Sequence, residues 1–320
     1  MMCKSNLAIV IPYYKNKFIE NTLESLSLQT VKNFTVYIGD DNSPYTIQPI
    51  LDKYCDKLEI RYHRFEVNLG GESLTKQWER CIDLTQEDWV WLFSDDDLIE
   101  CNAVEVFYNN YNEHSLLYKF HTKVIDEHGK LHPSYTKFDH LNDIGGSISS
   151  IDFIRNRLAC NGFRSFAVEY IFHRSLYERF KFADFPLGWA SDDATWFLYS
   201  LNNGKQITAL SSNVYWRFSG FNISSDIKSK SVVEKKLNAA SQYISWLKHV
   251  TTENEIAITD QLCLRWLSVQ AGSVHAEMGY EEFKKLIADA GISVNALKLV
   301  LSYFMALKKN RIINVLKRKS

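Results

Sequence analysis

Residues 89–97 read Trp-Val-Trp-Leu-Phe-Ser-Asp-Asp-Asp, an apolar run that leads directly into three carboxylates. The apolar run predicts a buried strand, and the carboxylates would then lie at its carboxyl end, partly removed from water. Three adjacent carboxylates repel one another, and a cation that prefers oxygen ligands, such as magnesium, manganese or calcium, relieves this repulsion. Taken alone, the cluster is equally explained by an acidic turn or a helix N-cap.

A second acidic strand end favours the metal-site interpretation. Residues 34–38 predict another strand, and Asp40 and Asp41 follow it in the run Gly-Asp-Asp-Asn-Ser of residues 39–43. This run is also compatible with an ordinary Asx turn. Ligands of open parallel sheets bind beyond the carboxyl ends of the strands. Two acidic strand ends therefore indicate a ligand site at one edge of a sheet.

Strand-like and helix-like segments alternate through the first hundred residues. The predicted strands cover residues 7–11, 34–38, 58–62 and 89–93, and apolar residues with helical spacing fall in 19–26, 47–54 and 74–82. This alternation predicts an α/β fold with a mostly parallel central sheet flanked by helices.

The remainder of the chain is mixed and then helical. The pattern predicts strands at 116–125, 167–172 and 207–218, a polar loop at 133–149, a helix from about 192 to 202, and helices from 231 to the end. We therefore predict a large α/β domain over residues 1–225. A helical C-terminal segment over residues 226–320 would pack on it.

The composition argues against several classes of protein. Hydrophobic residues make up 46% and charged residues 23% of the 320 residues, as in ordinary globular proteins, and the net charge of −1 indicates no nucleic-acid partner. No apolar stretch reaches the length of a membrane span, and residues 7–11 are too short for a signal peptide core. The six cysteines form no Cys-x-x-Cys pair, so we expect reduced thiols and a cytoplasmic location.

Two further segments are weaker candidates for a binding site. The run Asn-Leu-Gly-Gly of residues 68–71 could let a ligand approach the backbone, or it could be only a loop before a helix. Asp192 and Asp193 could simply favour a helix N-terminus through its dipole. The order and spacing of all these motifs are more informative than any one of them.

In that order the motifs resemble the family-two inverting glycosyltransferases, which have the GT-A fold. The similarity covers about residues 6–220 and rests on five runs, 8–14, 23–30, 34–43, 68–70 and 91–97. It implies a nucleotide-sugar donor and a bound manganese or magnesium ion. The implied nucleotide-binding residues are Pro12, Tyr13, Tyr14, Asp40, Asp41, Asn68, Gly70 and Asp95. The implied metal ligand is Asp96, with Asp95 or Asp97 assisting, and Ser94 stands where many members have Asp.

The resemblance also implies roles for two later sites. Asp192-Asp193 matches the Glu-Asp pair whose second residue is the catalytic base, so Asp193, or else Asp192, would be the base. Arg217 lies where members often carry a histidine-containing loop, and it would pair with the diphosphate. The Gln-x-x-Arg-Trp motif of processive members is missing from the sequence, so we expect single transfers.

The implied reaction is a one-step displacement with inversion at the anomeric carbon. The donor would be a UDP-sugar, by family frequency, and the acceptor a hydroxyl in glycan or surface polysaccharide synthesis. Two alternatives remain open, an inactive nucleotide-sugar-binding protein and a metal-dependent phosphohydrolase. The acidic clusters contain no histidine, which disfavours the phosphohydrolase, and the retained Asp192-Asp193 pair disfavours the inactive protein.

The C-terminal residues 295–320 contain seven basic residues and no acidic residue, among apolar positions. A basic amphipathic helix can lie on an anionic membrane surface, where a lipid-linked acceptor would fit. The alternative is a packed helix with a solvated basic tail. We expect residues 297–307 to dock on the α/β domain and the final basic turn to contact the inner face of a membrane peripherally.

Overall fold

The computed structural model describes residues 6–112, 114–220, 229–275 and 277–317, with side chains up to residue 306. The chain forms two compact units. The first contains residues up to 150 together with 162–184 and 195–219, and the second contains 151–161, 185–194 and the chain from 220 on. The predicted boundary between residues 225 and 226 lies outside the described residues.

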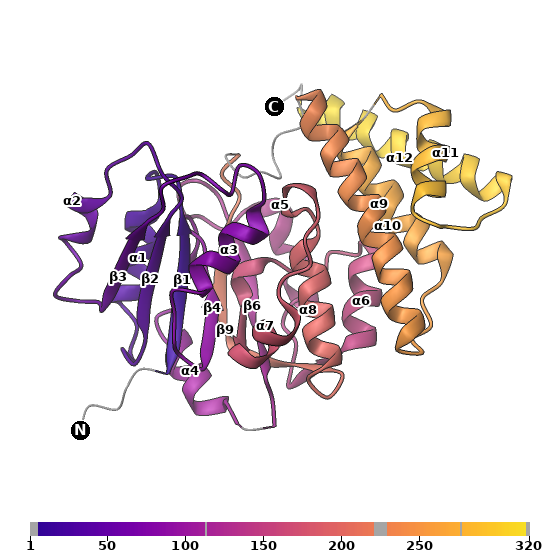
Figure 1. The fold of residues 1–320 in the computed structure, drawn as a ribbon. Coiled ribbons are helices and arrows are strands. Elements are labelled where there is room, and N and C mark those ends of the chain that lie inside the picture. Colours follow the sequence, from indigo (N-terminus) through magenta and orange to yellow (C-terminus); the bar gives the residue numbers. More distant parts are fainter. Residues whose placement is uncertain (1–5, 113, 221–228, 276, 318–320) are drawn as a thin grey trace. The chain divides into compact units, whose positions relative to one another are not determined.

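The described strands form one sheet of nine strands (Figure 1). They are β1 (Leu7–Tyr13), β2 (Thr35–Asp40), β3 (Ile60–Arg64), β4 (Trp89–Leu92), β5 (Leu98–Ile99), β6 (Leu117–Ile125), β7 (Ser147–Ser149), β8 (Tyr170–His173) and β9 (Gln206–Arg217). Their order is β3-β2-β1-β4-β8-β6-β9-β5, and β7 also pairs with β9. The ladders among β1 to β4 and between β6 and β9 are parallel and hold most of the paired residues. This confirms the predicted α/β fold with a mostly parallel sheet.

Helices connect the strands and make up most of the second unit. They are α1 (Ile19–Ser27), α2 (Gln48–Leu51), α3 (Leu74–Ile82), α4 (Ala103–Asn110), α5 (Pro133–Thr136), α6 (Ser150–Ala159), α7 (Arg174–Phe180), α8 (Ser191–Leu201), α9 (Lys230–Glu253), α10 (Asp260–Val274), α11 (Tyr280–Asp289) and α12 (Ala296–Lys317). Three short 3-10 helices are η1 (Asp139–Leu141), η2 (Ala167–Glu169) and η3 (Pro186–Gly188).

Strand β1 is buried on both faces, which explains its unbroken apolar sequence. Ile9 and Ile11 belong to a core cluster that also holds the apolar residues of α1 and α4. The alternate residues face the other side, where Gly39 of β2 lies directly against Cys81 of α3, so close that a side chain at Gly39 would collide with the thiol. Helices therefore cover both faces of the sheet and leave the carboxyl ends of the strands to loops.

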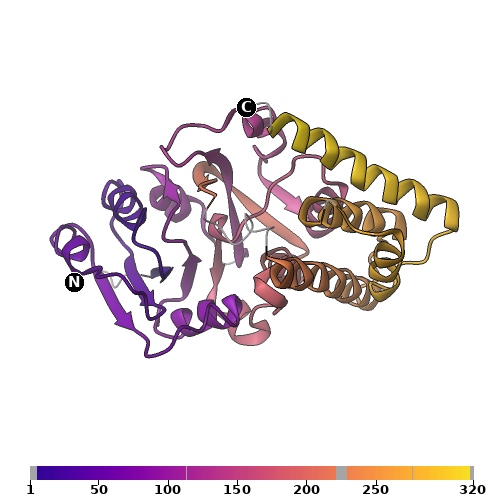
Figure 2. The ribbon, with the colours of Figure 1, turned by 90° about the horizontal axis from the view of Figure 1, so that it is seen from above.

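The second unit is a bundle in which α10 packs against both α9 and α12 (Figure 2). Lys248 of α9 forms a 2.7 Å ion pair with Asp260 at the start of α10. Thr259 caps α10, because its side chain accepts a hydrogen bond from the Leu262 N–H. In the described part of the chain, no helix is long and apolar enough to cross a membrane.

The predicted strands and most predicted helices occur within a few residues of their expected positions. Residues 133–149, predicted as a loop, instead contain α5, η1 and β7, and residues 167–172 begin with η2 before β8 starts. Helices α4, α6 and α7 were not predicted. Helix α4 has only eight residues and no side-chain cap, so its sequence carries little helical signal.

Candidate active site

The ends of β1, β2 and β4 are tied together by hydrogen bonds between their loops. The N–H of Asp41 donates to the Tyr13 carbonyl at 2.9 Å. The Ser43 hydroxyl donates to the Tyr14 carbonyl at 2.7 Å. The backbone N–H groups of Tyr14 and Lys15 donate to one carboxylate oxygen of Asp95, at 3.1 and 3.0 Å. The two acidic strand ends and the Pro12-Tyr13-Tyr14 turn therefore share one edge of the sheet, as the parallel order predicts.

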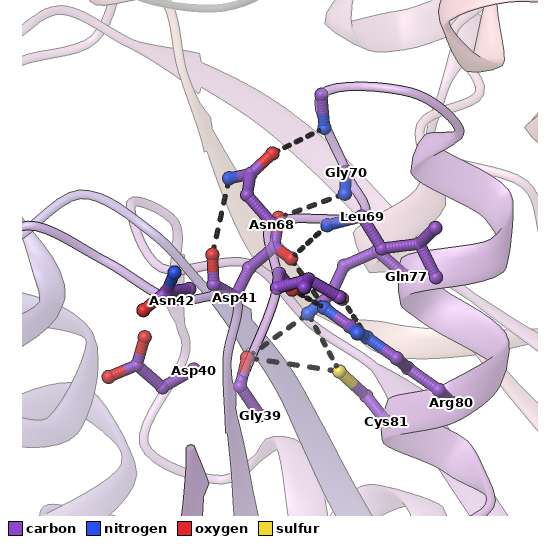
Figure 3. A network of polar contacts seen from close by, with 12 residues as sticks. Gly39, Asp40, Asp41, Asn42, Asn68, Leu69, Gly70, Gln77, Arg80 and Cys81 are labelled. Atoms are coloured by element: carbon purple, nitrogen blue, oxygen red, sulfur yellow. Dashed lines mark hydrogen bonds and ion pairs between the residues drawn. The ribbon is translucent and has the colours of Figure 1, made fainter. Parts of the chain in front are cut away.

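Asp41 holds the Asn-Leu-Gly loop in place (Figure 3). Its carboxylate accepts hydrogen bonds from the N–H groups of Leu69 at 2.7 Å and Gly70 at 2.9 Å. It also forms an ion pair with Arg80 at 2.5 Å. Asn68 donates its side-chain amide to the Asp41 carbonyl at 3.2 Å. The side chain of Asp41 is 5% exposed, so it contacts the loop from the buried side. The binding role predicted for Asn68 and Gly70 depends on this support.

Asp40 is fully buried, and residues of the neighbouring strand β3 compensate its negative charge. One oxygen accepts hydrogen bonds from the Tyr62 hydroxyl at 2.5 Å and from the Arg64 guanidinium at 2.9 Å, both on β3. The other oxygen accepts from the Ser43 N–H at 2.7 Å. Tyr62 and Arg64 are partly exposed, so they present polar groups at the surface above Asp40. A nucleobase contact by Asp40 itself stays a prediction.

Replacing Gly70 by Ala should lower the melting temperature by several degrees. The added Cβ would lie 2.7 Å from the Asp41 oxygen that already accepts the Gly70 N–H. Overpacking of this kind costs about 1–3 kcal/mol, which corresponds to roughly 2–4 °C for each kcal/mol in a domain of this size. Gly145→Ala is the matched control, because no atom lies within 4 Å of the added Cβ. Equal melting temperatures for the two variants would show that Asp41 does not fix this loop.

The acidic loop of residues 94–97 is organised by the Ser94 hydroxyl, which lies 2.7 Å from a carboxylate oxygen of both Asp96 and Asp97. Asp97 is 1% exposed, and its second oxygen accepts the Arg217 N–H at 2.7 Å. Asp95 and Asp96 are half-buried. Asp97 therefore supports the loop from inside, while Asp95 and Asp96 are accessible to a ligand.

Burial and mutual repulsion disfavour the ionised state of the three carboxylates. Burial and the charge of Asp96 raise the pKa of Asp95 to about 7. Burial raises the pKa of Asp96, and burial together with Asp96 raises the pKa of Asp97 well above its usual range. A divalent cation would compete with these protons and favour the ionised loop.

Arg217 braces the acidic loop through main-chain contacts. Its Nε donates to the Asp96 carbonyl at 2.7 Å, and one terminal nitrogen donates to the carbonyls of Asp126 and Glu127 at 3.2 and 3.1 Å. The guanidinium lies 4.5 Å from the centre of the Phe18 ring. Arg217 is 2% exposed, so in this structure it positions the loop, and its predicted contact with a diphosphate stays a prediction.

The acidic loop offers two half-buried carboxylates, those of Asp95 and Asp96, for the predicted cation. Among the described residues, no three His, Cys, Asp or Glu side chains are grouped closely enough to hold a metal ion. Magnesium usually takes one or two carboxylates and completes its shell with phosphate oxygens and water. Asp96, with Asp95 beside it, provides such a partial set at the strand end.

The Asp192-Asp193 pair lies in the second unit, at the start of α8, whereas all the other predicted site residues lie in the first. Asp193 is 3% exposed and forms a bidentate ion pair with Arg157 of α6. The Arg157 Nε lies 2.9 and 3.0 Å from the two oxygens of Asp193, and a terminal nitrogen lies 2.7 Å from one of them. Both oxygens of Asp193 are therefore engaged.

Asp192 is half-buried and more accessible than Asp193. Burial, followed by the charge of Asp193, raises the pKa of Asp192 to about 7, while Arg157 acts in the opposite direction. The segment before the pair is strained, because Leu187 and Ala190 have φ angles of 60° and 62°. Non-glycine residues adopt this left-handed conformation uncommonly, and Cys160, Lys181 and Lys205 also do so in this chain.

The sequence did not point to several residues that organise the site. They are Tyr62, Arg64, Arg80, Ser94 and Arg157. Most of them act through a carboxylate more than twenty residues away, and nothing in the local sequence marks that partner. Ser94 belonged to the quoted acidic run, where the sequence suggested only a replaced carboxylate.

The comparisons with known proteins concern the sequence family and the fold of the chain. The model of "Glycosyl transferase family 2" matches residues 8–171, about half of the chain. Among solved structures, S. aureus TarS 1-349 in complex with UDP-GlcNAc is similar, with a TM-score of 0.57, 16% identity, and coverage of 96% of this chain and 91% of that chain.

Two further structures of the same protein are also similar. TarS 1-349 in complex with UDP has a TM-score of 0.51 at 17% identity, with the same coverage of 96% and 91%. S. aureus TarS has a TM-score of 0.53 at 18% identity, over 95% of this chain and 55% of that chain. No curated protein matches the chain. Identities this low show a shared fold, while the family match over half of the sequence shows that the chain belongs to glycosyl transferase family 2.

Proposed function

We propose that the protein transfers a sugar from a UDP-sugar to an acceptor hydroxyl, with inversion, in glycan or polysaccharide synthesis. The observation that carries this proposal is the joined edge of β1, β2 and β4, where the half-buried carboxylates of Asp95 and Asp96 stand beside the Tyr14 turn. TarS, which shares the fold, has been crystallised with UDP and with UDP-GlcNAc, and this supports UDP as the nucleotide.

In this proposal the donor's nucleotide lies along the strand ends. Tyr14, 40% exposed, and the Asn68-Leu69-Gly70 loop would contact the base and ribose, with Asp40 and Asp41 supporting them. Asp96, assisted by Asp95, would hold manganese or magnesium against the diphosphate. When bound, the metal would stabilise the negative charge that develops on the leaving diphosphate.

The displacement needs a base for the acceptor hydroxyl. The acceptor oxygen forms a bond to the anomeric carbon while the bond to the diphosphate oxygen breaks, and the diphosphate leaves with that electron pair. The hydroxyl proton passes to a carboxylate. Of the two predicted candidates, Asp192 is favoured, because Arg157 engages both oxygens of Asp193. A pKa near 7 also suits Asp192 for accepting a proton at neutral pH.

Thermal shift with a panel of nucleotide sugars tests the proposal. UDP-sugars at about 100 times their dissociation constant should stabilise the protein by roughly 2.7 kcal/mol, and the shift should be smaller when EDTA replaces manganese. GDP- and ADP-sugars serve as matched donors with the wrong base. No stabilisation by any nucleotide sugar would reject a donor site at this edge, and stabilisation without transfer to any hydroxyl would indicate the inactive binding protein.

A further inference from the structure

Helix α12 has apolar residues on two opposite sides. One side packs within the second unit, where Leu299 is 8% exposed and the Tyr303 ring contacts Tyr280 and Phe283. The Tyr303 hydroxyl also donates to the Met278 carbonyl at 3.0 Å. The docking of residues 297–307 on the α/β domain stays a prediction, because these contacts all lie within the second unit.

The other side is exposed and carries four large apolar residues, which we call the α12 stripe. They are Leu297 at 69%, Leu301 at 53%, Phe304 at 55% and Met305 at 66% exposure. Their spacing of four, three and one residues places them within about one third of the helix circumference. Figure 2 shows α12, in yellow, as a long helix at the edge of the helical unit.

This concentration is unusual within the described chain. The other eight exposed large apolar side chains are scattered through the first unit, whereas these four fall within nine residues. Single exposed apolar residues need no explanation, but a contiguous set marks an interaction surface. A helix with two apolar sides usually buries both of them. The α12 stripe is therefore a candidate interaction surface.

The charge of the helix indicates what covers it. Residues 296–317 contain five basic residues and no acidic one, although the whole chain has a net charge of −1. Lys298 is exposed and follows Leu297 at the border of the stripe. A second copy would bring two basic helices together, whereas an anionic surface would be attracted to one. Apolar residues beside excess lysine and arginine are typical of a helix that lies in a lipid interface.

We propose that α12 seats the protein on an anionic lipid surface, with the α12 stripe buried at the boundary between headgroups and acyl chains. Lys298, at the border of the stripe, would then lie near the lipid phosphates. This inference concerns a different surface from the sheet edge and does not depend on the transferase activity.

Co-sedimentation of the full chain with vesicles tests the proposal. The wild type should bind vesicles of phosphatidylglycerol and phosphatidylcholine, and bind pure phosphatidylcholine much less. Leu301→Gln combined with Phe304→Gln should weaken binding at least about tenfold, because each loses a large buried apolar side chain. Lys298→Gln should weaken it about fivefold, and the loss should shrink at high salt.

Leu28→Gln combined with Val67→Gln is the matched control, since these residues are 60% and 63% exposed on the first unit. This variant should bind vesicles like the wild type. Equal vesicle binding by the stripe variant and the wild type would overturn the proposal, as would no binding by the wild type. A concentration-dependent dimer that the stripe variant loses, seen by light scattering without vesicles, would overturn it in favour of a second copy.

Discussion

Asp192→Asn should lower the turnover number by about 10²–10⁴-fold, because the amide keeps the shape of the carboxylate but cannot accept the acceptor's proton. The affinity for UDP, measured by calorimetry, should stay unchanged, because in the proposed mechanism the base contacts the acceptor and not the nucleotide. The melting temperature should also hold, since Asp192 is only half-buried. Near-normal turnover in this variant would remove Asp192 from the mechanism.

The pH profile gives an independent measure of the same group. Asp192 acts as a base only when ionised, and its pKa is raised to about 7, with Asp193, Arg157 and Tyr243 nearby. The value of kcat/KM should therefore rise with pH through about 7 and level off above it. Asp192→Asn should lose this limb. A wild-type limb near the ordinary value of about 4 would place the base elsewhere.

Asp193→Asn separates a structural role from a chemical one. Removing the negative charge takes the bidentate ion pair from Arg157, although Asp192 stays nearby, which should cost roughly 3 kcal/mol of unfolding free energy. That figure is the lower end of the usual range, because the Arg157 side chain is still 21% exposed. A variant that keeps its stability but loses turnover would instead identify Asp193 as the base, and Asp192 as its neighbour.

Asp96→Asn should abolish the metal dependence of UDP binding. In the wild type, calorimetry should show UDP affinity falling at least about tenfold, or about 1.4 kcal/mol, when EDTA replaces manganese. In the variant the two affinities should be equal and low. Asp88→Asn is the matched control, because this exposed residue precedes the opposite end of β4. Equal wild-type affinity with manganese and with EDTA would contradict a metal at the acidic loop.

The sequence revealed the sheet because β1, β2 and β4 are buried on both faces and read as unbroken apolar runs. The acidic ends of β2 and β4 had to lie at one edge, because both strands run parallel to β1. The partners of those carboxylates could not be predicted. Arg64 and Arg157 are ordinary basic residues in the sequence, and only the tertiary fold brings them to Asp40 and Asp193.

Arg217 shows a second limit. Its place where family members often carry a histidine-containing loop suggested a contact with the diphosphate, yet in the fold its guanidinium donates to main-chain carbonyls. Every residue has a backbone carbonyl, so the sequence of residues 126–127 could not have predicted their hydrogen bonds with Arg217. Similarly, the exposed side of α12 could not be separated from its packed side, because both are apolar.

Arg157 and Arg217 should show different patterns of conservation in an alignment of relatives. Arg157 faces a side chain, so a change at position 193 should be accompanied by a change at position 157, and the two columns should covary. Arg217 faces the carbonyls of Asp126 and Glu127, which every amino acid supplies. Positions 126 and 127 can therefore drift while Arg217 stays constant, and a search for covarying pairs would overlook the residue that braces the acidic loop.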